Sequence, residues 1–428
     1  MGHETVIVLC TGSSGNHVLA ADLGRDPGFE VRLVSSRAAS WSRRIACEET
    51  HVLSDALPFS SYTRLERREG TIAAIFPWEE VDRACDGADI VVLTCPVHAH
   101  RDVLERVLPA LSRPTIVGTL YAQGGFDWLV RDVCERLGLA RPQHTWFGLK
   151  RFPYLCKAVD PGRSVRLMGR FPKIVAALHG PRRAEAKTLL RRMFGKPVVE
   201  VPSFLNCTLN ISNQVLHPAI SSPVLRHRPP GAVFSEPVPL YGSIDLEGAS
   251  NMCALANEII AVAARLEPLT GISLVEHIGA DPGVWMYLQF RRWLGRHFEG
   301  WRPYEVARDL CVATSIRHNR RLEQAMIPMV PGPRGEGLRP NFGSRFWLDD
   351  IPHGLCVVLG LGAIVGVQMP RARQLVLEHQ AHMGKRYLGE DGSGFGPELH
   401  ETNAPQRYGI HDREGLAKFL ATAASLEG

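Results

Sequence analysis

Short runs of apolar and β-branched residues recur in the first half of the chain, separated by stretches with helical spacing. Predicted strands lie at residues 5–10, 29–34, 90–93 and 115–118. Predicted helices lie at residues 18–23, 81–85 and 103–111. The first and third strands carry no polar alternation, which is typical of strands buried on both faces of a sheet. Strand and helix alternating with short turns predict right-handed βαβ units and a parallel sheet.

The pattern changes near residue 202. Beyond it strand signals become rare, and long helical patterns cover residues 249–266, 304–325 and 355–379. A Pro- and Gly-rich stretch at residues 328–339 predicts a surface loop between helices. We therefore expect an α/β chain with two domains, a parallel-sheet domain at residues 1–201 and a mostly α-helical domain at residues 202–428.

Composition supports two domains and excludes some partners. The 428 residues exceed what one hydrophobic core usually serves, and 45% hydrophobic with 22% charged residues is ordinary for a globular enzyme. A net charge of +5 is too small to indicate nucleic-acid binding, and it suits anionic small substrates and a phosphorylated cofactor equally. The ten cysteines are scattered singly, without a C-x-x-C pair, which predicts reduced thiols and no zinc site.

The first residues and the longest apolar stretch predict neither export nor membrane insertion. The first residues run directly into a predicted strand, without a basic region followed by an apolar stretch. The longest apolar stretch, residues 355–367, contains glycines and is too short to span a bilayer. We expect a cytoplasmic protein without a membrane partner.

The turn after the first predicted strand is the first candidate binding site. It reads Thr11-Gly12-Ser13-Ser14-Gly15-Asn16 and leads into a helix, where small residues and free N–H groups would accept a dinucleotide pyrophosphate. Serines replace glycines of the usual G-x-G-x-x-G pattern, so a ligand-free tight turn is the alternative. Its position at the end of the first strand favours a Rossmann-type dinucleotide-binding domain.

The end of the second predicted strand bears on the choice of cofactor. NAD-binding domains usually carry an acidic residue there, but residues 35–44 contain none. Ser35, Ser36 and Arg37 are instead suited to a ribose 2′-phosphate. We therefore favour NADP(H) over NAD(H); an ordinary surface arginine is the alternative for Arg37.

The second domain carries two candidate catalytic segments. Asn213 precedes His217-Pro218, and a histidine is suited to proton transfer near neutral pH. Arg345 precedes Asp349-Asp350, whose carboxylates can orient a histidine, while the arginine can bind a substrate carboxylate. The alternatives are a structural His-Pro pair and a helix N-cap at the two aspartates.

Four segments together resemble the opine dehydrogenase family, the octopine and nopaline dehydrogenases. They are the glycine-containing turn with His17 and Leu19 after it, Phe152-Pro-Tyr-Leu-Cys-Lys157, the Asn213 to Pro218 segment, and the Arg345 to Pro352 segment. The four occur in the family's order along both halves of the chain. The length of the chain and its tail after about residue 386 also resemble the bacterial staphylopine-type branch, whose amine substrate is larger than a simple amino acid.

The resemblance implies an NAD(P)-dependent oxidoreductase acting on CH–NH bonds, in which an amino-acid amine condenses with a 2-oxo acid and the imine is reduced. His217 would exchange the proton, Asp350 would set its tautomer, and Arg345 would bind a carboxylate. The other implied site residues are Asn213 and Tyr241 at the substrate and Thr94, Cys95 and Pro96 near the nicotinamide. The expected partners are small molecules, with a homodimer through the helical domain as the candidate assembly.

Two other functions remain open at this stage. One is reduction of a small 2-oxo acid or imine without condensation, and the other is cofactor binding without turnover. We expect no metal, because the histidines at 98, 100, 379 and 382 lack suitably spaced partners. Trp285, Trp293 and Trp301 are candidates for lining a pocket with Arg291-Arg292, but we expect them to pack in the core. Residues 226–228 are further substrate-binding candidates, but we expect a solvated basic turn there.

Overall fold

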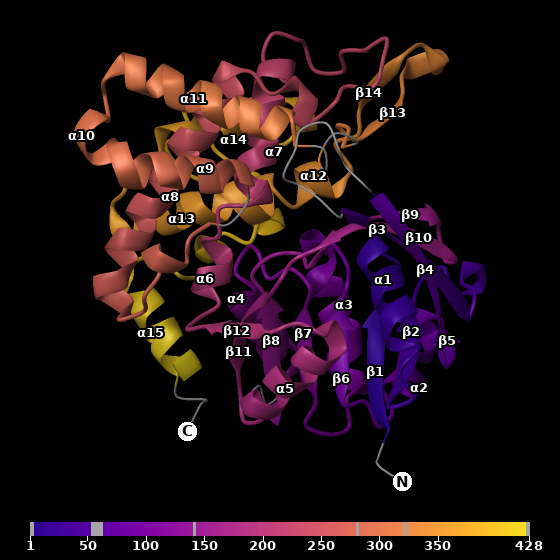
Figure 1. Cartoon of the computed structure of the whole chain (residues 1–428). Coiled ribbons are helices and arrows are strands. Elements are labelled where there is room, and N and C mark those ends of the chain that lie inside the picture. The colour runs from indigo at the N-terminus through magenta and orange to yellow at the C-terminus, as the bar shows by residue number, and fades with distance from the viewer. Residues whose placement is uncertain are drawn as a thin grey trace. The chain divides into compact units, whose positions relative to one another are not determined.

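The computed structural model describes residues 4–52, 63–139, 143–279, 282–319, 322 and 325–424. The chain forms two compact units (Figure 1). The first contains the residues up to Ala122, Phe126–Cys207 and the residues from Thr422 onward, and the second contains Gln123–Gly125 and Thr208–Ala421. The chain thus passes between the units a few residues beyond the expected division at 201, and Gln123–Gly125, expected in the first domain, groups with the second.

An eight-stranded sheet forms the centre of the first unit, with the order β12-β11-β8-β7-β6-β1-β2-β5. Its strands are β1 (Thr5–Cys10), β2 (Phe29–Val34), β5 (Ala74–Phe76), β6 (Ile90–Leu93), β7 (Ile116–Thr119), β8 (Thr145–Leu149), β11 (Ile174–His179) and β12 (Val198–Val201). Every neighbouring pair is parallel except β8 and β11, which are antiparallel. Its helices are α1 (Ser14–Leu23), α2 (Val81–Cys85), α3 (His100–Val107), α4 (Phe126–Leu137) and α5 (Arg183–Phe194). The expected parallel-sheet domain is confirmed.

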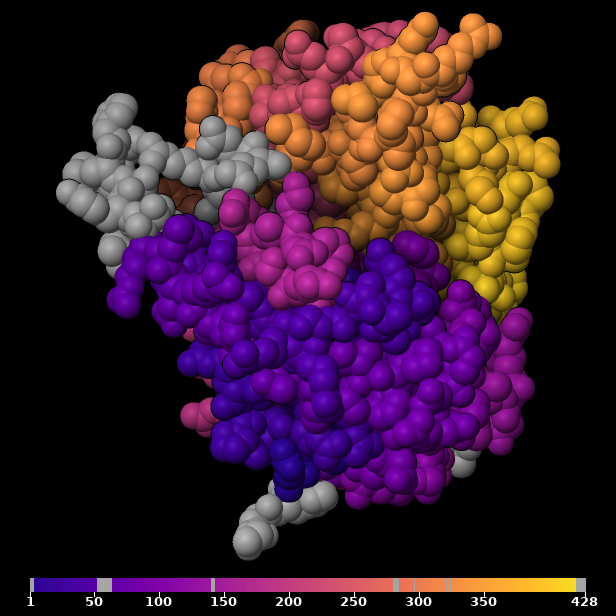
Figure 2. Space-filling view, turned by 90° about the vertical axis from the view of Figure 1, so that its right-hand side faces the viewer, coloured from indigo at the N-terminus to yellow at the C-terminus, as the bar shows by residue number. Residues whose placement is uncertain are grey.

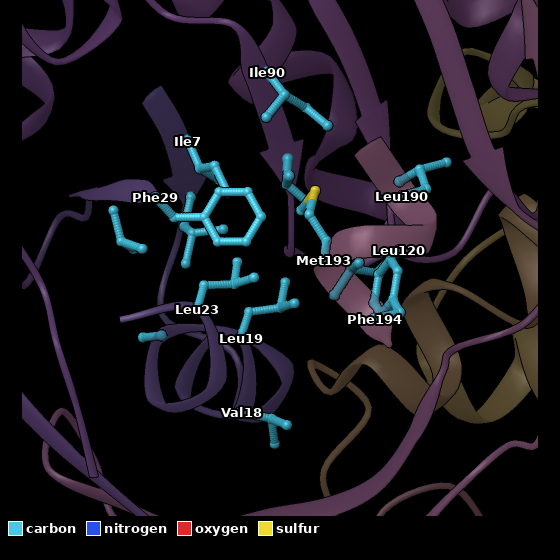
Figure 3. Packing of buried hydrophobic residues seen from close by; sticks show 14 of the residues in the cluster. Ile7, Val18, Leu19, Leu23, Phe29, Ile90, Leu120, Leu190, Met193 and Phe194 are labelled. Atoms are coloured by element: carbon cyan, nitrogen blue, oxygen red, sulfur yellow. The ribbon is translucent and has the colours of Figure 1, made fainter. Parts of the chain in front are cut away.

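Both faces of this sheet are buried, as the apolar strands predict. Along β1, Ile7 and Leu9 belong to one core cluster, whereas Val8 and Cys10 belong to the cluster on the opposite face. Figure 3 shows the first cluster, in which Leu19 and Leu23 of α1 lie close to Ile7 and Phe29 of the strands. The first strand is therefore fixed from both sides at the point where the chain enters the candidate cofactor turn.

A second sheet, with the order β4-β3-β10-β9, was not expected from the sequence. Its strands are β3 (Arg44–Val52), β4 (Thr63–Thr71), β9 (Tyr154–Asp160) and β10 (Ser164–Arg170). Arg68 and Arg170 each pair with both Asp22 and Glu49 at N–O distances of 2.5–2.9 Å. Because Asp22 lies on α1, this buried network joins the helix after the cofactor turn to the second sheet.

Helices dominate the second unit, which confirms the expected helical domain. They are α7 (Asn213–Leu225), α8 (Leu246–Thr270), α9 (Pro282–Phe290), α10 (Arg296–Phe298), α11 (Arg302–Arg317), α12 (Arg345–Leu348), α13 (Cys356–Val365), α14 (Pro370–Met383) and α15 (Arg413–Ala424). The short α6 (Leu205–Thr208) lies at the boundary between the units. The helix α8 begins at the cap Asp245, whose carboxylate accepts the Gly248 N–H at 2.7 Å, and ends at left-handed Gly271.

Two expectations for this unit are wrong. The helical pattern at 355–379 forms two helices, because Gly366 adopts φ +74° and Pro370 starts a new helix. The expected loop at 328–339 contains a hairpin of β13 (Met329–Pro331) and β14 (Leu338–Pro340), whose prolines and glycines masked the strand signal.

Among the described residues, one helical stretch is long and apolar enough to cross a membrane. It is Arg345–Val365, and 83% of its apolar window is buried inside the protein. Burial of this kind is found in the central helix of a helical core.

Candidate active site

The helix α7 carries His217 in its interior. His217 is 5% exposed, and Pro218 and Pro223 lie in the same helix, where each removes a backbone N–H. The carbonyl of Ala219, which would otherwise accept from residue 223, accepts the side-chain amide of Asn251 at 3.4 Å. The buried helix thus keeps its shape despite two prolines, with side chains replacing a lost backbone hydrogen bond.

A buried carboxylate fixes the imidazole of His217. Its Nδ1 lies 2.7 Å from Oδ2 of Asp350, which is 2% exposed. Asp350 immediately precedes a turn of π-helix, Ile351–Leu355, in which the Leu355 N–H donates to the Asp350 carbonyl at 2.9 Å. Because the carboxylate accepts from Nδ1, the Nε2 atom is the one left to exchange a proton.

Two aromatic residues complete the surroundings of the imidazole. The hydroxyl of Tyr241 lies 3.2 Å from Nε2, and the ring of Phe346 stacks on the imidazole with centroids 3.8 Å apart. The structure therefore brings together His217, Asp350 and Tyr241 from three separate segments. Phe346 was missed from the sequence, since a phenylalanine beside a tryptophan resembles ordinary core.

Burial and charged neighbours act on the Asp350 carboxyl in opposite directions. Burial raises the pKa of the Asp350 carboxyl above its ordinary value, and the neighbouring Asp349 acts in the same direction, while His217 and Arg345 lower it. A carboxylate that is desolvated in this way gains most when its histidine partner is positively charged. The arrangement is suited to stabilising an imidazolium formed during proton transfer.

Arg345 and Asn213 flank this pair without a hydrogen bond to it among the described residues. Arg345 is exposed at the start of α12, one residue before Phe346, and its charge acts on Asp350. Asn213 is half-buried at the start of α7, one helical turn before His217. Both remain predicted substrate-binding residues.

Two buried glutamines near the π-turn were missed from the sequence. Both side chains are at least 99% buried. Among the described residues, the Nε2 and Oε1 atoms of Gln123 and the Oε1 atom of Gln214 have no hydrogen-bond partner. A Cβ on Gly354 would lie 2.9 Å from Nε2 of Gln123 and 2.5 Å from Cβ of Gln214. Gly354 thus allows two amides that can hydrogen-bond a substrate to approach the segment carrying Asp350. The sequence feature that could have indicated Gln123 is its position shortly after the carboxyl end of β7, where ligands bind in parallel sheets.

In the first unit, the candidate cofactor turn has the expected strand-to-helix geometry. Ser13 caps α1 by accepting the Asn16 N–H at 3.2 Å, and Ser14 accepts the N–H of Ala158 at 3.0 Å. A Cβ on Gly15 would lie 2.4 Å from the ring of Phe152, so no larger residue fits there without displacing that ring. The carbonyl of Thr11 accepts the side-chain amide of Asn16. The serines that replace glycines therefore cap and fasten the turn.

The residues at the carboxyl ends of β1, β2 and β6 lie next to one another. Thr94 donates through its hydroxyl to the Cys10 carbonyl at 2.8 Å and lies 3.4 Å from the Thr11 hydroxyl; Cys95 and Pro96 follow it. After β2, the Ser35 hydroxyl accepts the N–H of Arg37 at 3.2 Å, while the Ser36 and Arg37 side chains are exposed. The turn at Gly12–Asn16 with its helix N-terminus fits a pyrophosphate, and the exposed arginine fits an additional phosphate. The cofactor roles of these residues remain predictions.

Other sequence candidates have structural surroundings. His100 contacts the Thr119 hydroxyl at 3.0 Å, and within the described residues no group of His, Cys, Asp and Glu side chains is arranged for a metal. Arg226 pairs with Glu378 and Glu247, so the expected solvated basic turn is wrong at this residue. The expectation that the three tryptophans pack in the core is also wrong, since the exposed fractions of Trp285, Trp293 and Trp301 are 53%, 77% and 56%.

Comparison with known proteins gives the relatives of this chain. Residues 200–383 match the family model described as NAD/NADP octopine/nopaline dehydrogenase, alpha-helical domain. Octopine dehydrogenase of Pecten maximus is 26% identical over 428 residues, covering 96% of this chain and 98% of that protein. Tauropine dehydrogenase of Arabella iricolor is 25% identical, covering 96% and 99%. The chain thus carries the helical domain of this family and matches octopine and tauropine dehydrogenases over nearly its whole length. It is accordingly an NAD(P)-dependent oxidoreductase acting on CH–NH bonds, as the resemblance implied.

Solved structures agree with this family at the level of the fold. Octopine dehydrogenase with NADH and L-arginine superposes with a TM-score of 0.75 at 23% identity, covering 96% of this chain and 98% of that one. Yersinopine dehydrogenase with NADP+ gives a TM-score of 0.65 at 14% identity, covering 98% and 100%. Both the sheet domain and the helical domain of this chain therefore have solved counterparts.

Proposed function

We propose that the chain catalyses the NADP(H)-dependent reductive condensation of an amino acid with a 2-oxo acid. The amine adds to the oxo carbon, water leaves, and reduction of the resulting imine gives a secondary amine. The reduced nicotinamide, when bound, supplies the hydride. The observation that supports the proposal most directly is the buried pair of His217 and Asp350 at 2.7 Å.

His217 moves the protons that this chemistry requires. As imidazolium it donates from Nε2 to the oxygen that leaves as water, and in the reverse direction Nε2 accepts the proton from the substrate amine. Asp350 holds the proton on Nδ1 and stabilises the positive charge. The Tyr241 hydroxyl lies 3.2 Å from Nε2, so it is close enough to hydrogen-bond a substrate group that reacts at this nitrogen.

Substrate carboxylates are bound by the cationic and amide groups near this pair. Arg345 is exposed and carries no ion pair among those found in the described residues, so its guanidinium is available for a bidentate contact. Asn213 lies one turn before His217 and can accept or donate a hydrogen bond to the same substrate. Both substrates carry a carboxylate, so positive charge near the reacting atoms lowers the cost of bringing them together.

The preference for NADP(H) rests on the residues after β2. No acidic residue is present at 35–44 to bind a ribose 2′-hydroxyl, and Arg37 is exposed at the carboxyl end of the strand. Among the relatives, octopine dehydrogenase has been solved with NADH and yersinopine dehydrogenase with NADP+. The family thus includes proteins of both kinds, and Arg37 is the feature of this chain that favours the phosphorylated cofactor.

The test is oxidation of NADPH, and separately of NADH, against a matrix of amino acids and 2-oxo acids, followed by absorbance. We expect turnover only in wells that contain both an amine and an oxo acid, and faster with NADPH. Turnover with an oxo acid alone would assign the chain to the simple reductases. Cofactor binding without turnover in any well would contradict the proposal for these substrate classes.

A further inference from the structure

The chain after α14 returns to the helix that follows Asp350. This C-terminal segment, residues 397–413, lies beyond residues 200–383 that the family model matches, and it includes two 3-10 turns, Pro397–Glu401 and Pro405–Tyr408. Figure 2 shows the C-terminal residues in yellow, packed against orange residues of the second unit. No role for this segment followed from its residue pattern.

Three hydrogen bonds join the C-terminal segment to successive carbonyls of one helical stretch. The N–H of Asn403 donates to Pro352 at 3.3 Å, in the π-turn. The side-chain amide of Gln406 donates to Gly360 at 2.9 Å, in the middle of α13, and Arg413 donates to Val365 at 3.0 Å, at its end. The segment therefore holds the beginning, middle and end of the helix that starts from Asp350.

The contact is tightly packed as well as hydrogen-bonded. Thr402 and Ala404 are fully buried, and Asn403 is 2% exposed and accepts the hydroxyl of Tyr408 at 2.7 Å. A Cβ on Gly360 would lie 2.3 Å from Oε1 of Gln406 and 2.8 Å from Cδ of Pro405. Because Pro405 is a rigid ring, an added methyl at Gly360 displaces the segment from α13.

The π-turn explains why support from outside the helix matters. A π-turn holds one more residue than an α-turn, and its occurrence is rare and concentrated at functional sites. Here it fixes the main chain of Asp350 through the Leu355 N–H, and Pro352 contributes no N–H of its own. A shift of this turn moves the carboxylate relative to Nδ1 of His217, which is held on a different helix.

We infer that the C-terminal segment is a clamp that positions Asp350 against His217, with Gln406 and Arg413 as positioning residues. This inference rests on the proposed function, since it assigns the segment a role through the proposed catalytic pair. The segment touches no reacting group in this role. It determines how well the carboxylate stabilises the charged imidazole.

The experiment compares Gly360→Ala and the milder Gln406→Ala with Ser393→Ala, an exposed position near this segment whose hydroxyl donates to Asp391 at 2.9 Å. Turnover is measured per cofactor-binding site across pH, so that unfolded protein is not counted. We expect Gly360→Ala to lower kcat about tenfold, with KM for both substrates within about twofold, because misplacement of a catalytic group acts on the chemical step. The alkaline limb of the kcat profile for NADPH oxidation should move to lower pH, because a displaced Asp350 carboxylate stabilises the imidazolium less. Gln406→Ala should change both quantities in the same direction by a smaller factor, and Ser393→Ala should change neither.

The outcomes separate the clamp from the function on which it rests. Wild-type kcat and pH profile in both Gly360→Ala and Gln406→Ala, together with a large loss in Asp350→Asn, would overturn the clamp and leave the function intact. Full activity in both His217→Ala and Asp350→Asn would overturn the function itself. Recovery of kcat in the double variant Gly360→Ala, Gln406→Ala, relative to Gly360→Ala alone, would support the clamp, because the contact with the glutamine is relieved. A lower thermal stability of Gly360→Ala with unchanged kcat per site and an unchanged pH profile would overturn it.

Discussion

The ring of Phe346 lies on the imidazole of His217, with centroids 3.8 Å apart and planes inclined by 9°. Asp350 fixes the same imidazole within its plane, and Tyr241 contacts its far nitrogen. The electron-rich face of an aromatic ring also attracts a cation. Phe346 therefore restricts the orientation of His217, and its ring face is placed to stabilise an imidazolium formed during the reaction.

Replacing Phe346 by leucine keeps most of the volume and removes the aromatic face. We expect kcat to fall by about three- to tenfold, since a contact of this kind contributes roughly 1 kcal/mol. The alkaline limb of the kcat profile for NADPH oxidation should move to lower pH, while Phe346→Tyr should behave like the unaltered protein. Phe342→Leu is the matched control, because Phe342 packs on Trp347 and His382. Equal effects of the two leucine variants would contradict a specific role for the stack.

Asp350→Asn tests the tautomer of His217. The asparagine amide can donate to Nδ1, which then must be unprotonated and leaves the proton on Nε2, so the histidine can no longer accept one there. We expect kcat to fall by about 10²–10⁴, as for loss of general acid–base catalysis, with cofactor affinity measured by nucleotide fluorescence unchanged. His217→Ala should lose a similar factor. If the fold-losses of kcat in the two single variants multiply in the double variant, the two residues do not act as one catalytic unit.

Parts of this site were accessible from the sequence because they are short-range patterns. His217-Pro218 and the aspartates before Pro352 stood out by residue type, and the strand-to-helix turn stood out by its position. The stack of Phe346 on His217 was inaccessible, since it joins residues that are far apart along the chain. Gln123 was missed for the same reason, because only the fold shows that its amide is buried with no hydrogen-bond partner in the part of the chain that the structure describes.

The same distinction applies to the fold. The strands β1 and β6 of the large sheet are continuously apolar and are recognisable locally. The second sheet contains strands such as β4, whose charged residues suggest a solvated surface, and Arg68 is nevertheless buried by pairing with Asp22 and Glu49. Such pairing is a property of tertiary structure and leaves no periodic signal.

Arg37→Ala tests the cofactor preference. If the guanidinium binds a 2′-phosphate, its removal should raise KM for NADPH by about 10- to 100-fold, the value of a charge-assisted hydrogen bond, and leave KM for NADH within about twofold. Arg44→Ala is the matched control, as Arg44 is exposed a few residues further along the chain. A parallel increase in both KM values would indicate a general loss of the binding site.

Thr11→Gly tests the strain in the cofactor turn. Thr11 adopts φ +81°, a left-handed conformation that glycine adopts without the steric cost of a Cβ. We expect the glycine variant to raise the free energy of unfolding by about 1 kcal/mol, after the entropy that glycine loses on folding. Thr11→Ala keeps the Cβ and the strain, so it should give no such gain. Urea denaturation of the three proteins makes the comparison; a less stable glycine variant would show that the weak contact of the Thr11 hydroxyl with Thr94 outweighs the strain.

The last prediction concerns acid stability and the buried His379. Burial lowers the pKa of this histidine to about 4; its Nδ1 bonds to the Leu375 carbonyl at 2.7 Å and its Nε2 lies 3.0 Å from the Ser221 hydroxyl. The unfolded chain therefore binds a proton at a higher pH, near 6.5, than the folded protein does. The contribution of neutral His379 to the free energy of unfolding is fully present above that pH. It is lost as pH decreases from about 6.5 towards 4, by up to about 3 kcal/mol.

His379→Gln should reduce this dependence, measured as the free energy of unfolding in urea between pH 7 and pH 4. The exposed His227 provides the matched control, because His227→Gln should leave the slope unchanged. The slope should diminish in the His379 variant without vanishing, since burial also lowers the pKa values of His17 and His144. If the two variants instead kept identical slopes, His379 would be shown to accept its proton in the folded protein, with Ser221 turning its hydroxyl towards the His217 carbonyl to receive the new N–H.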